Sequence, residues 1–197
     1  MPRSSTLHGS APDTSRFALL ILDLISDFEF EDGARLYKNA RPIARRIATL
    51  KRRVKAAGAP TIYVNDNLGR WRSDRAQIVD HCLRRNARGR ELVELLIPEP
   101  DDYFIVKPKH SGFFATPLHT LLENIRARTL ILTGVTSHQC VLFTAADAYV
   151  REYELAIPRD CIAAMDARQT RSALDIFRTA LKADTRPAGR IRLRSGR

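Results

Sequence analysis

The feature that most constrains the fold is the segment from Thr129 to Val150, in which a buried strand turns directly into a helix. Residues 129–134 (TLILTG) are a short apolar run ending in glycine, a pattern typical of a strand buried on both faces. From Gln139 to Val150, apolar residues recur at helical spacing with no proline. The segment therefore predicts a central strand followed by a sharp turn and an amphipathic helix.

Cys140 falls in the first turn of this predicted helix, and Ser137 fits the N-cap position. Unpaired backbone N–H groups and the positive end of the helix dipole favour a thiolate there. We therefore expect the pKa of Cys140 to be lowered, to roughly 3.5–7.5 instead of about 8.5. The same N–H groups are suited to holding an oxyanion. A small core residue is the competing interpretation of this cysteine.

Strand and helix patterns alternate along the whole chain. Apolar runs predict further strands at 17–23, 61–65, 103–107 and 155–157. Helical spacing predicts helices at 40–57, 75–85, 90–96, 117–127 and 168–182, with Pro42 in the first turn of the first of them. This alternation predicts a single three-layer α/β domain with a mostly parallel, roughly six-stranded, Rossmann-like sheet.

The chain of 197 residues has the length of one domain. We expect a flexible leader at 1–15, a domain at 16–185, and either a basic tail or an edge strand at 186–197. No apolar run is long enough for a membrane span, and the first residues have no apolar signal-peptide core. Three cysteines, odd in number and far apart, favour reduced thiols in the cytoplasm.

The net charge of +11 raises the question of nucleic acid. Five arginines and no acid lie in 186–197, and a second basic cluster, at 45–55, lies on one face of a predicted helix. Neither cluster has interleaved aromatic residues or a nucleic-acid-binding motif. The charge therefore indicates solvated surface, and we expect no specific nucleic-acid partner and no membrane partner.

Chemically capable side chains coincide with the predicted strand ends. Asp23, Asp66, Lys107 and Cys140 all fall at, or just past, the carboxyl ends of strands. In parallel α/β sheets these ends share one edge, and ligands bind there. Together, an acid, a cation and a thiol at the start of a helix predict a catalytic site at this edge.

Four sequence motifs carry a family resemblance. They are ILDLISDF (21–28), IYVNDN (62–67), KPKHSGFFATPL (107–118) and TGVTSHQCVLFTAADA (133–148), supported by IPRDC at 157–161. In this order and spacing they resemble the isochorismatase-like cysteine hydrolases, which include nicotinamidases, N-carbamoylsarcosine amidases and ureidoacrylate amidohydrolases. The resemblance runs from about 17 to 183. Ile25 departs from it, because many relatives carry glutamine there.

The resemblance implies a hydrolase that cleaves an amide or carbamoyl C–N bond of a small molecule through a thioester. Cys140 would be the nucleophile, Asp23 the proton acceptor, and Lys107 the cation that orients Asp23. Backbone N–H groups of Thr136 and Cys140 would form the oxyanion hole, with a cis peptide bond between Val135 and Thr136. The resemblance also implies a homo-oligomer, a dimer or larger.

Nicotinamidases bind a divalent ion through an Asp-x-His pair, which this chain lacks, since Asp66 is followed by Asn67 and Leu68. His81 and His110 are not spaced as ligands, so we expect no metal and no other cofactor, and nicotinamide is an unfavoured substrate. The loops at the sheet edge supply candidate pocket residues. These are Asp66, Asn67, Trp71, His110, Phe113, Phe114 and His138.

Three other functions compete with amide cleavage. Vinyl-ether hydrolysis of the isochorismatase type protonates a carbon and needs no thiolate, so Cys140 favours the amide reaction. A binding or regulatory protein on this scaffold would not need Asp23, Lys107 and Cys140 together. A dinucleotide-binding oxidoreductase is disfavoured because the first strand leads into LISDFEF, without a Gly-x-Gly-x-x-Gly motif.

Overall fold

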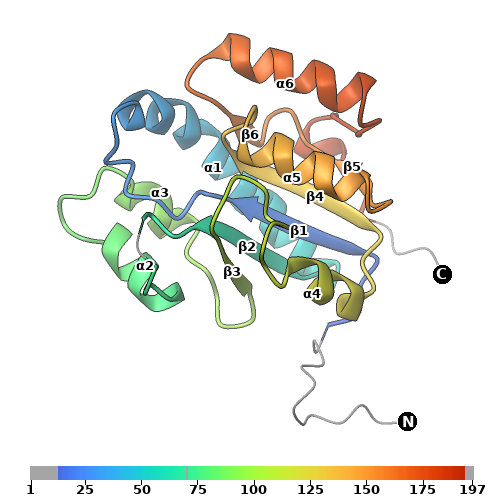
Figure 1. Cartoon of the computed structure of the whole chain (residues 1–197), viewed down its shortest axis with the longest axis horizontal. Coiled ribbons are helices and arrows are strands. Elements are labelled where there is room, and N and C mark those ends of the chain that lie inside the picture. Colours follow the sequence, from blue (N-terminus) through green and yellow to red (C-terminus); the bar gives the residue numbers. More distant parts are fainter. Residues whose placement is uncertain (1–12, 70, 194–197) are drawn as a thin grey trace, which may run out of the picture.

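A central sheet of six strands organises the molecule in the computed structural model, which describes residues 13–69 and 71–193. The strands are β1 (Phe17–Leu22), β2 (Thr61–Asp66), β3 (Tyr103–Lys107), β4 (Thr129–Val135), β5 (Glu154–Ala156) and β6 (Ile162–Ala163). They pair in parallel in the order β3-β2-β1-β4-β5, and β6 pairs with the carboxyl end of β4 (Figure 1).

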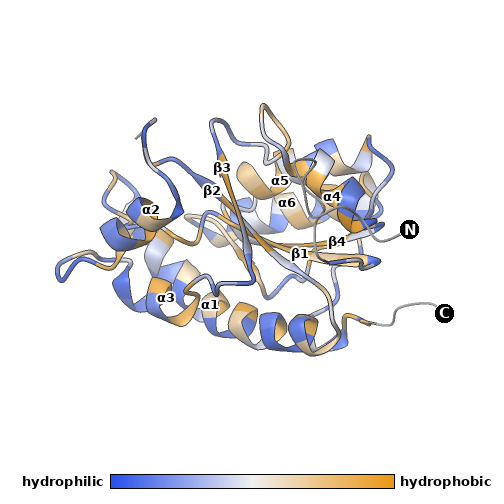
Figure 2. Cartoon of the chain, turned by 90° about the horizontal axis from the view of Figure 1, so that it is seen from below, coloured by the Kyte–Doolittle hydropathy of each residue, from blue (hydrophilic) through white to orange (hydrophobic). Residues whose placement is uncertain are grey.

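Helices cover both faces of this sheet (Figure 2). One face carries α1 (Gly33–Ala56), α2 (Arg75–Cys82) and α3 (Arg90–Leu95), and the other carries α4 (Leu118–Ile125), α5 (Cys140–Tyr149) and α6 (Ala167–Thr179). The expected three-layer, mostly parallel α/β domain is confirmed. No described helix combines the length and apolarity needed to cross a membrane.

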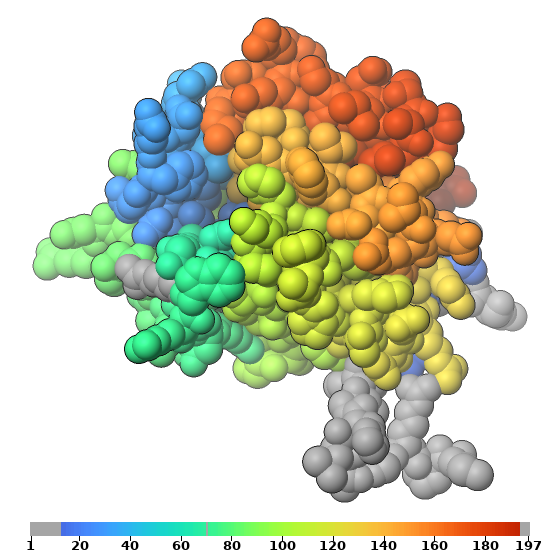
Figure 3. Space-filling view, viewed as in Figure 1, coloured from blue at the N-terminus to red at the C-terminus, as the bar shows by residue number. Residues whose placement is uncertain are grey.

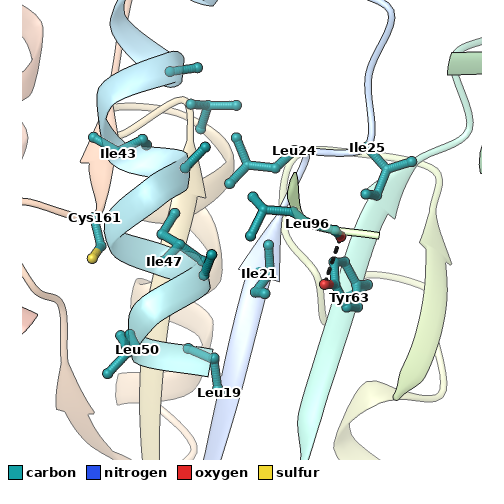
Figure 4. Packing of buried hydrophobic residues seen from close by; sticks show 14 of the residues in the cluster. Leu19, Ile21, Leu24, Ile25, Ile43, Ile47, Leu50, Tyr63, Leu96 and Cys161 are labelled. Atoms are coloured by element: carbon teal, nitrogen blue, oxygen red, sulfur yellow. Dashed lines mark hydrogen bonds between the residues drawn. The ribbon is translucent and has the colours of Figure 1, made fainter. Parts of the chain in front are cut away.

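The core lies in two layers because successive residues of a strand point to opposite faces. In β1, Leu19 and Ile21 join the cluster under α1, whereas Leu20 and Leu22 join the cluster under α5. Figure 4 shows the first cluster, where the Tyr63 hydroxyl also donates a 2.8 Å hydrogen bond to a backbone carbonyl. All six residues of β1 are buried, as expected for a strand in the middle of the sheet with helices on both faces.

The first helix is longer than predicted. It begins at Gly33, so Pro42 lies inside the helix and not in its first turn. Proline removes one helical hydrogen bond, but Pro42 faces solvent, where water can satisfy the carbonyl that loses its partner. The two-residue strand β6 was not predicted, because two apolar residues carry no periodic signal.

The chain beyond α6 differs from the predicted edge strand. Only an isolated parallel bridge between Ala156 and Asp184 forms there, followed by a 3-10 helix at Ala188–Arg190. The Arg53 guanidinium holds this helix against α1 by donating to the Ala188 and Ile191 carbonyls, at 2.6 and 3.0 Å. The rest of the predicted basic tail, 194–197, and residues 1–12 of the predicted leader lie outside the described residues. Asp13, within that leader, accepts a hydrogen bond from the Tyr103 hydroxyl.

Candidate active site

The carboxyl edge of the sheet brings together the three side chains that the sequence singled out. Asp23 directly follows β1, in a left-handed backbone conformation (φ 53°). Lys107 is the last residue of β3, and Cys140 is the first residue of α5. Because β1, β3 and the strand β4 before α5 are parallel, their carboxyl ends place these residues at one edge of the sheet.

Lys107 lies between the other two groups. Its Nζ is 2.9 Å from Asp23 Oδ2 and 3.4 Å from Cys140 Sγ. The Lys107 ammonium therefore bridges the Asp23 carboxylate and the Cys140 sulfur. Backbone groups fix both ends of the cluster, since Asp66 N donates to Asp23 Oδ1 (2.6 Å) and Lys107 Nζ donates to the Lys109 carbonyl (3.1 Å). The lysine side chain is 1% exposed, so the ammonium is almost wholly removed from water.

Burial dominates the protonation of this cluster. It raises the pKa of Asp23, although the neighbouring Lys107 ammonium opposes the rise. Burial alone would lower the pKa of Lys107, but the charges of Asp23 and Cys140 outweigh it, and the pKa of Lys107 is raised. The expected lowering of the Cys140 pKa is wrong. Burial and the nearby Asp23 carboxylate raise the pKa of Cys140 to about 12, against the lowering effect of Lys107. The resting thiol therefore keeps its proton next to a base.

The turn between β4 and α5 places two backbone donors beside the sulfur. The Val135–Thr136 peptide bond is cis, as the resemblance implied. The N–H groups of Thr136 and Cys140 make no hydrogen bond with the described backbone. Ser137 is not the N-cap, because its N–H donates to the Ala163 carbonyl (2.8 Å) and Gln139 occupies the cap position instead.

A cavity of about 540 Å³ opens onto this cluster. Its wall comes from the loop after β1, the end of β2, α2, the loop after β3 and the turn before α5, most of which meet on the face seen in Figure 3. The lining residues are Asp23, Ile25, Ser26, Asp27, Phe28, Glu29, Phe30, Leu36, Asn65, Asp66, Leu68, His81, Lys107, His110, Val135, Thr136 and Cys140. The cavity lining therefore combines apolar and polar side chains, and it includes Cys140.

Only two of the expected pocket residues line this cavity. Asp66 contributes from the end of β2, and His110 lies with its Nδ1 3.8 Å from Cys140 Sγ. Five others point elsewhere for separate reasons. Asn67 is buried and accepts a hydrogen bond from Gly69 N (2.9 Å).

The remaining four of these five residues are aromatic or imidazole side chains. Trp71 is 79% exposed and Phe114 is 56% exposed, so neither lines the cavity wall. Phe113 is buried in the core under α5 and packs on the Tyr153 ring. His138 lies on the turn before α5 but outside the cavity lining.

Sequence reasoning missed the wall formed by 25–30 and His81. Residues 25–30 follow Asp23 directly, so the rule that places ligands beyond strand ends would have indicated them. His81 carried no such signal, because its position depends on how α2 packs. Its Nε2 lies 2.7 Å from Asp27 Oδ2 and 2.9 Å from an Arg84 guanidinium nitrogen.

The described residues do not form the donor set of a divalent-metal site. Asp66 Oδ1 accepts a hydrogen bond from Leu68 N (2.7 Å), in the place where an Asp-x-His pair would offer a histidine. His81 is engaged by Asp27. Within 13–69 and 71–193, no three His, Cys, Asp or Glu side chains are grouped so as to hold a metal ion.

The parallel sheet, the polar cluster at its carboxyl edge and the adjoining cavity are typical of an α/β enzyme whose site lies beyond the strand ends. The family model of the isochorismatase domain matches residues 17–185. The chain therefore belongs to the isochorismatase family and is a hydrolase of that family.

Individual relatives agree with this assignment. The chain is 42% identical over 167 residues to YaaI, an uncharacterized isochorismatase family protein of Bacillus subtilis, covering 85% of this chain and 91% of that one. Among solved structures, a cysteine hydrolase from Pseudomonas syringae pv. phaseolicola has a TM-score of 0.73 at 26% identity, covering 88% and 89% of the two chains. A nicotinamidase from Staphylococcus aureus has a TM-score of 0.68 at 25% identity, covering 88% and 99%.

Proposed function

We propose that this hydrolase cleaves a C–N bond, in an amide or carbamoyl group of a small molecule, through a thioester on Cys140. One observation carries the proposal, which is the position of the Cys140 thiol. Its sulfur lies 3.4 Å from the Lys107 ammonium, which is in turn 2.9 Å from the Asp23 carboxylate, and it lines a cavity. A nucleophile, a base and a fixed cation in contact are what acyl transfer by cysteine requires.

The reaction begins with a proton transfer that the geometry favours. As Cys140 Sγ attacks the carbonyl carbon, its proton passes to the Asp23 carboxylate. Burial raises the pKa values of both groups, so one proton is shared between them and moves in step with attack. Lys107 keeps its charge throughout, because its pKa is raised, and it stabilises the negative charge on either partner.

Collapse of the tetrahedral intermediate completes the first half of the reaction. The unpaired N–H groups of Thr136 and Cys140 donate to the oxyanion. The C–N bond breaks, and Asp23 returns its proton to the departing amine. Water then attacks the thioester while Asp23 accepts its proton, and the thiol is restored as the acid leaves.

The similar structures support cysteine-based amide chemistry over vinyl-ether hydrolysis. A nicotinamidase and a cysteine hydrolase share the fold of this chain. The retained Cys140 also supports the amide reaction, since protonation of a vinyl ether needs an acid and no thiol.

We further propose that the enzyme acts as a homo-oligomer in the cytoplasm. Phe143, near the start of α5, and Val150, the residue that caps its end, are 52% and 71% exposed. Apolar side chains so exposed favour contact with a second copy. Size-exclusion chromatography with light scattering tests this, and a monomer at micromolar concentration would contradict it.

A panel of small primary amides and carbamoyl compounds, assayed for ammonia release, tests the catalytic proposal. We expect the wild type to hydrolyse at least one member and Cys140→Ala to hydrolyse none. Turnover retained in Cys140→Ala contradicts the proposal, and so does cleavage of vinyl ethers without cleavage of any amide. Circular dichroism of the variant shows that it is folded.

A further inference from the structure

The catalytic cavity has an unusual charge for this chain. The sequence holds 33 lysines and arginines against 22 acids. The cavity reverses this balance, since four carboxylates line it and Lys107 is the one lysine or arginine among its described lining residues. The carboxylates belong to Asp23, Asp27, Glu29 and Asp66.

Three of these carboxylates already have a partner. Asp23 pairs with Lys107 at 2.9 Å, Asp27 with His81 at 2.7 Å, and Glu29 with an exposed arginine at 3.5 Å. Asp66 differs, because it forms no ion pair with any described residue. Its Oδ1 accepts a single hydrogen bond from the backbone of Leu68.

Asp66 is also close to the reacting groups. Its backbone N–H donates to Asp23 Oδ1 at 2.6 Å, so the residue adjoins the catalytic carboxylate. Its negative charge reaches Lys107, where it helps to raise the pKa of the ammonium. An unpaired carboxylate thus lies at the cavity wall, within reach of a molecule attacked by Cys140.

The histidine at the same wall accounts for one of the other carboxylates. The His81 side chain is 8% exposed, and its ring lines the cavity. Its Nε2 lies 2.7 Å from Asp27 Oδ2 and 2.9 Å from an Arg84 guanidinium nitrogen. Asp27 is therefore already engaged, which leaves Asp66 as the carboxylate open to a cation.

We propose that Asp66 is a specificity residue and that the substrate is an amide carrying a protonated amine. This rests on the proposed thioester chemistry. The cation pairs with Asp66 while the amide carbonyl lies over Cys140. Amides bearing a carboxylate are rejected, because the cavity wall has no described cation other than Lys107, which Asp23 occupies.

Charged thiol reagents test this selectivity without a substrate. Methanethiosulfonates that carry an aminoethyl cation or a sulfonatoethyl anion transfer their thioalkyl group to a cysteine, and mass spectrometry measures the rate at Cys140. Each rate is divided by that of a small free thiol. We expect the cationic reagent to be favoured by about tenfold, and Asp66→Asn to remove most of that preference. The matched control is Asp80→Asn, on the exposed side of α2 and outside the cavity lining, which should keep the preference.

Turnover of matched amides provides the second readout. We compare 4-aminobutanamide, pentanamide and 4-carboxybutanamide, and expect Asp66→Asn to reduce the kcat/KM ratio of the cationic to the neutral amide by about 10- to 100-fold. The proposal is overturned if the wild type shows no preference for the cationic reagent. It is also overturned if Asp66→Asn and Asp80→Asn show the same preference. A reagent preference that depends on Asp66 supports the proposed role of Asp66 even if no amide is hydrolysed. Failure to hydrolyse any amide counts only against the thioester chemistry.

Discussion

Replacing Lys107 by methionine separates the role of the cation from that of the thiol. Methionine keeps most of the length of the buried side chain and removes the charge that lies 2.9 Å from Asp23. Lys107 is the strongest influence that lowers the pKa of Asp23, against the burial that raises it. Without the ammonium, the pKa of Asp23 rises further and the base is protonated over a wider pH range.

The size of the effect follows from the geometry. An opposite charge within about 4–6 Å lowers a carboxyl pKa by roughly 1–3 units. The short distance and the 1% exposure of Lys107 place this pair at the upper end of that range. We therefore expect the acid limb of the kcat/KM profile to move up by about 2–3 pH units. At a pH below the acid limbs of both enzymes, that shift corresponds to a kcat/KM about 100- to 1000-fold lower in Lys107→Met than in the wild type.

The assay is a pH–rate profile on an amide from the ammonia-release panel. In the wild type, activity rises with pH as Asp23 loses its proton, at a pH above the ordinary carboxyl value of 3.8 because its pKa is raised. In Lys107→Met, activity should recover partly at alkaline pH. Lys38→Met, on the exposed face of α1, should leave the profile unchanged. An acid limb in Lys107→Met that coincides with the wild-type limb would refute the argument.

Two further predictions concern stability, each measured by chemical denaturation. Gly134 has φ +115°, and an added Cβ would lie 2.1 Å from the Leu22 carbonyl oxygen. Gly134→Ala should therefore lower the free energy of unfolding by at least about 2 kcal/mol more than Gly58→Ala, where the site is open. Equal losses in the two variants would contradict this. Lys51→Met should lower the free energy of unfolding by about 3–5 kcal/mol, because it leaves Asp102 without its partner in the buried ion pair at 2.5 Å. The double change with Asp102→Leu should recover most of this loss. A double variant as unstable as the single one would contradict the pairing argument.

The sequence predicted the sheet well because its strands are continuous apolar runs. All six residues of β1 are buried, and such a strand is hard to mistake for a surface element. The strand ends then predicted where Asp23, Lys107 and Cys140 would meet. Parallel topology alone forces that meeting, so it required no knowledge of side-chain packing.

The parts that failed depend on tertiary packing. The position of Cys140 at a helix terminus predicted a lowered pKa. Burial and the charge of Asp23 raise that pKa instead, and neither can be seen in the local sequence. Trp71 and Phe114 were expected in the pocket because they lie in loops at the sheet edge, yet both side chains turn outward. His81 was missed for the converse reason, since only the packing of α2 brings it to the cavity wall.

The central claim is that Cys140 forms a covalent bond to the substrate, and Cys140→Ser tests it most directly. Serine differs from cysteine by one atom, so the fold and the contact with Asp23 should persist. Its hydroxyl is far harder to ionise than a thiol, and we predict that kcat falls by at least about 10²-fold. Asp23→Asn should be nearly as damaging, and the double variant little worse than either, because the two residues act as a unit. A folded Cys140→Ser enzyme that retains the wild-type kcat would contradict thiol catalysis.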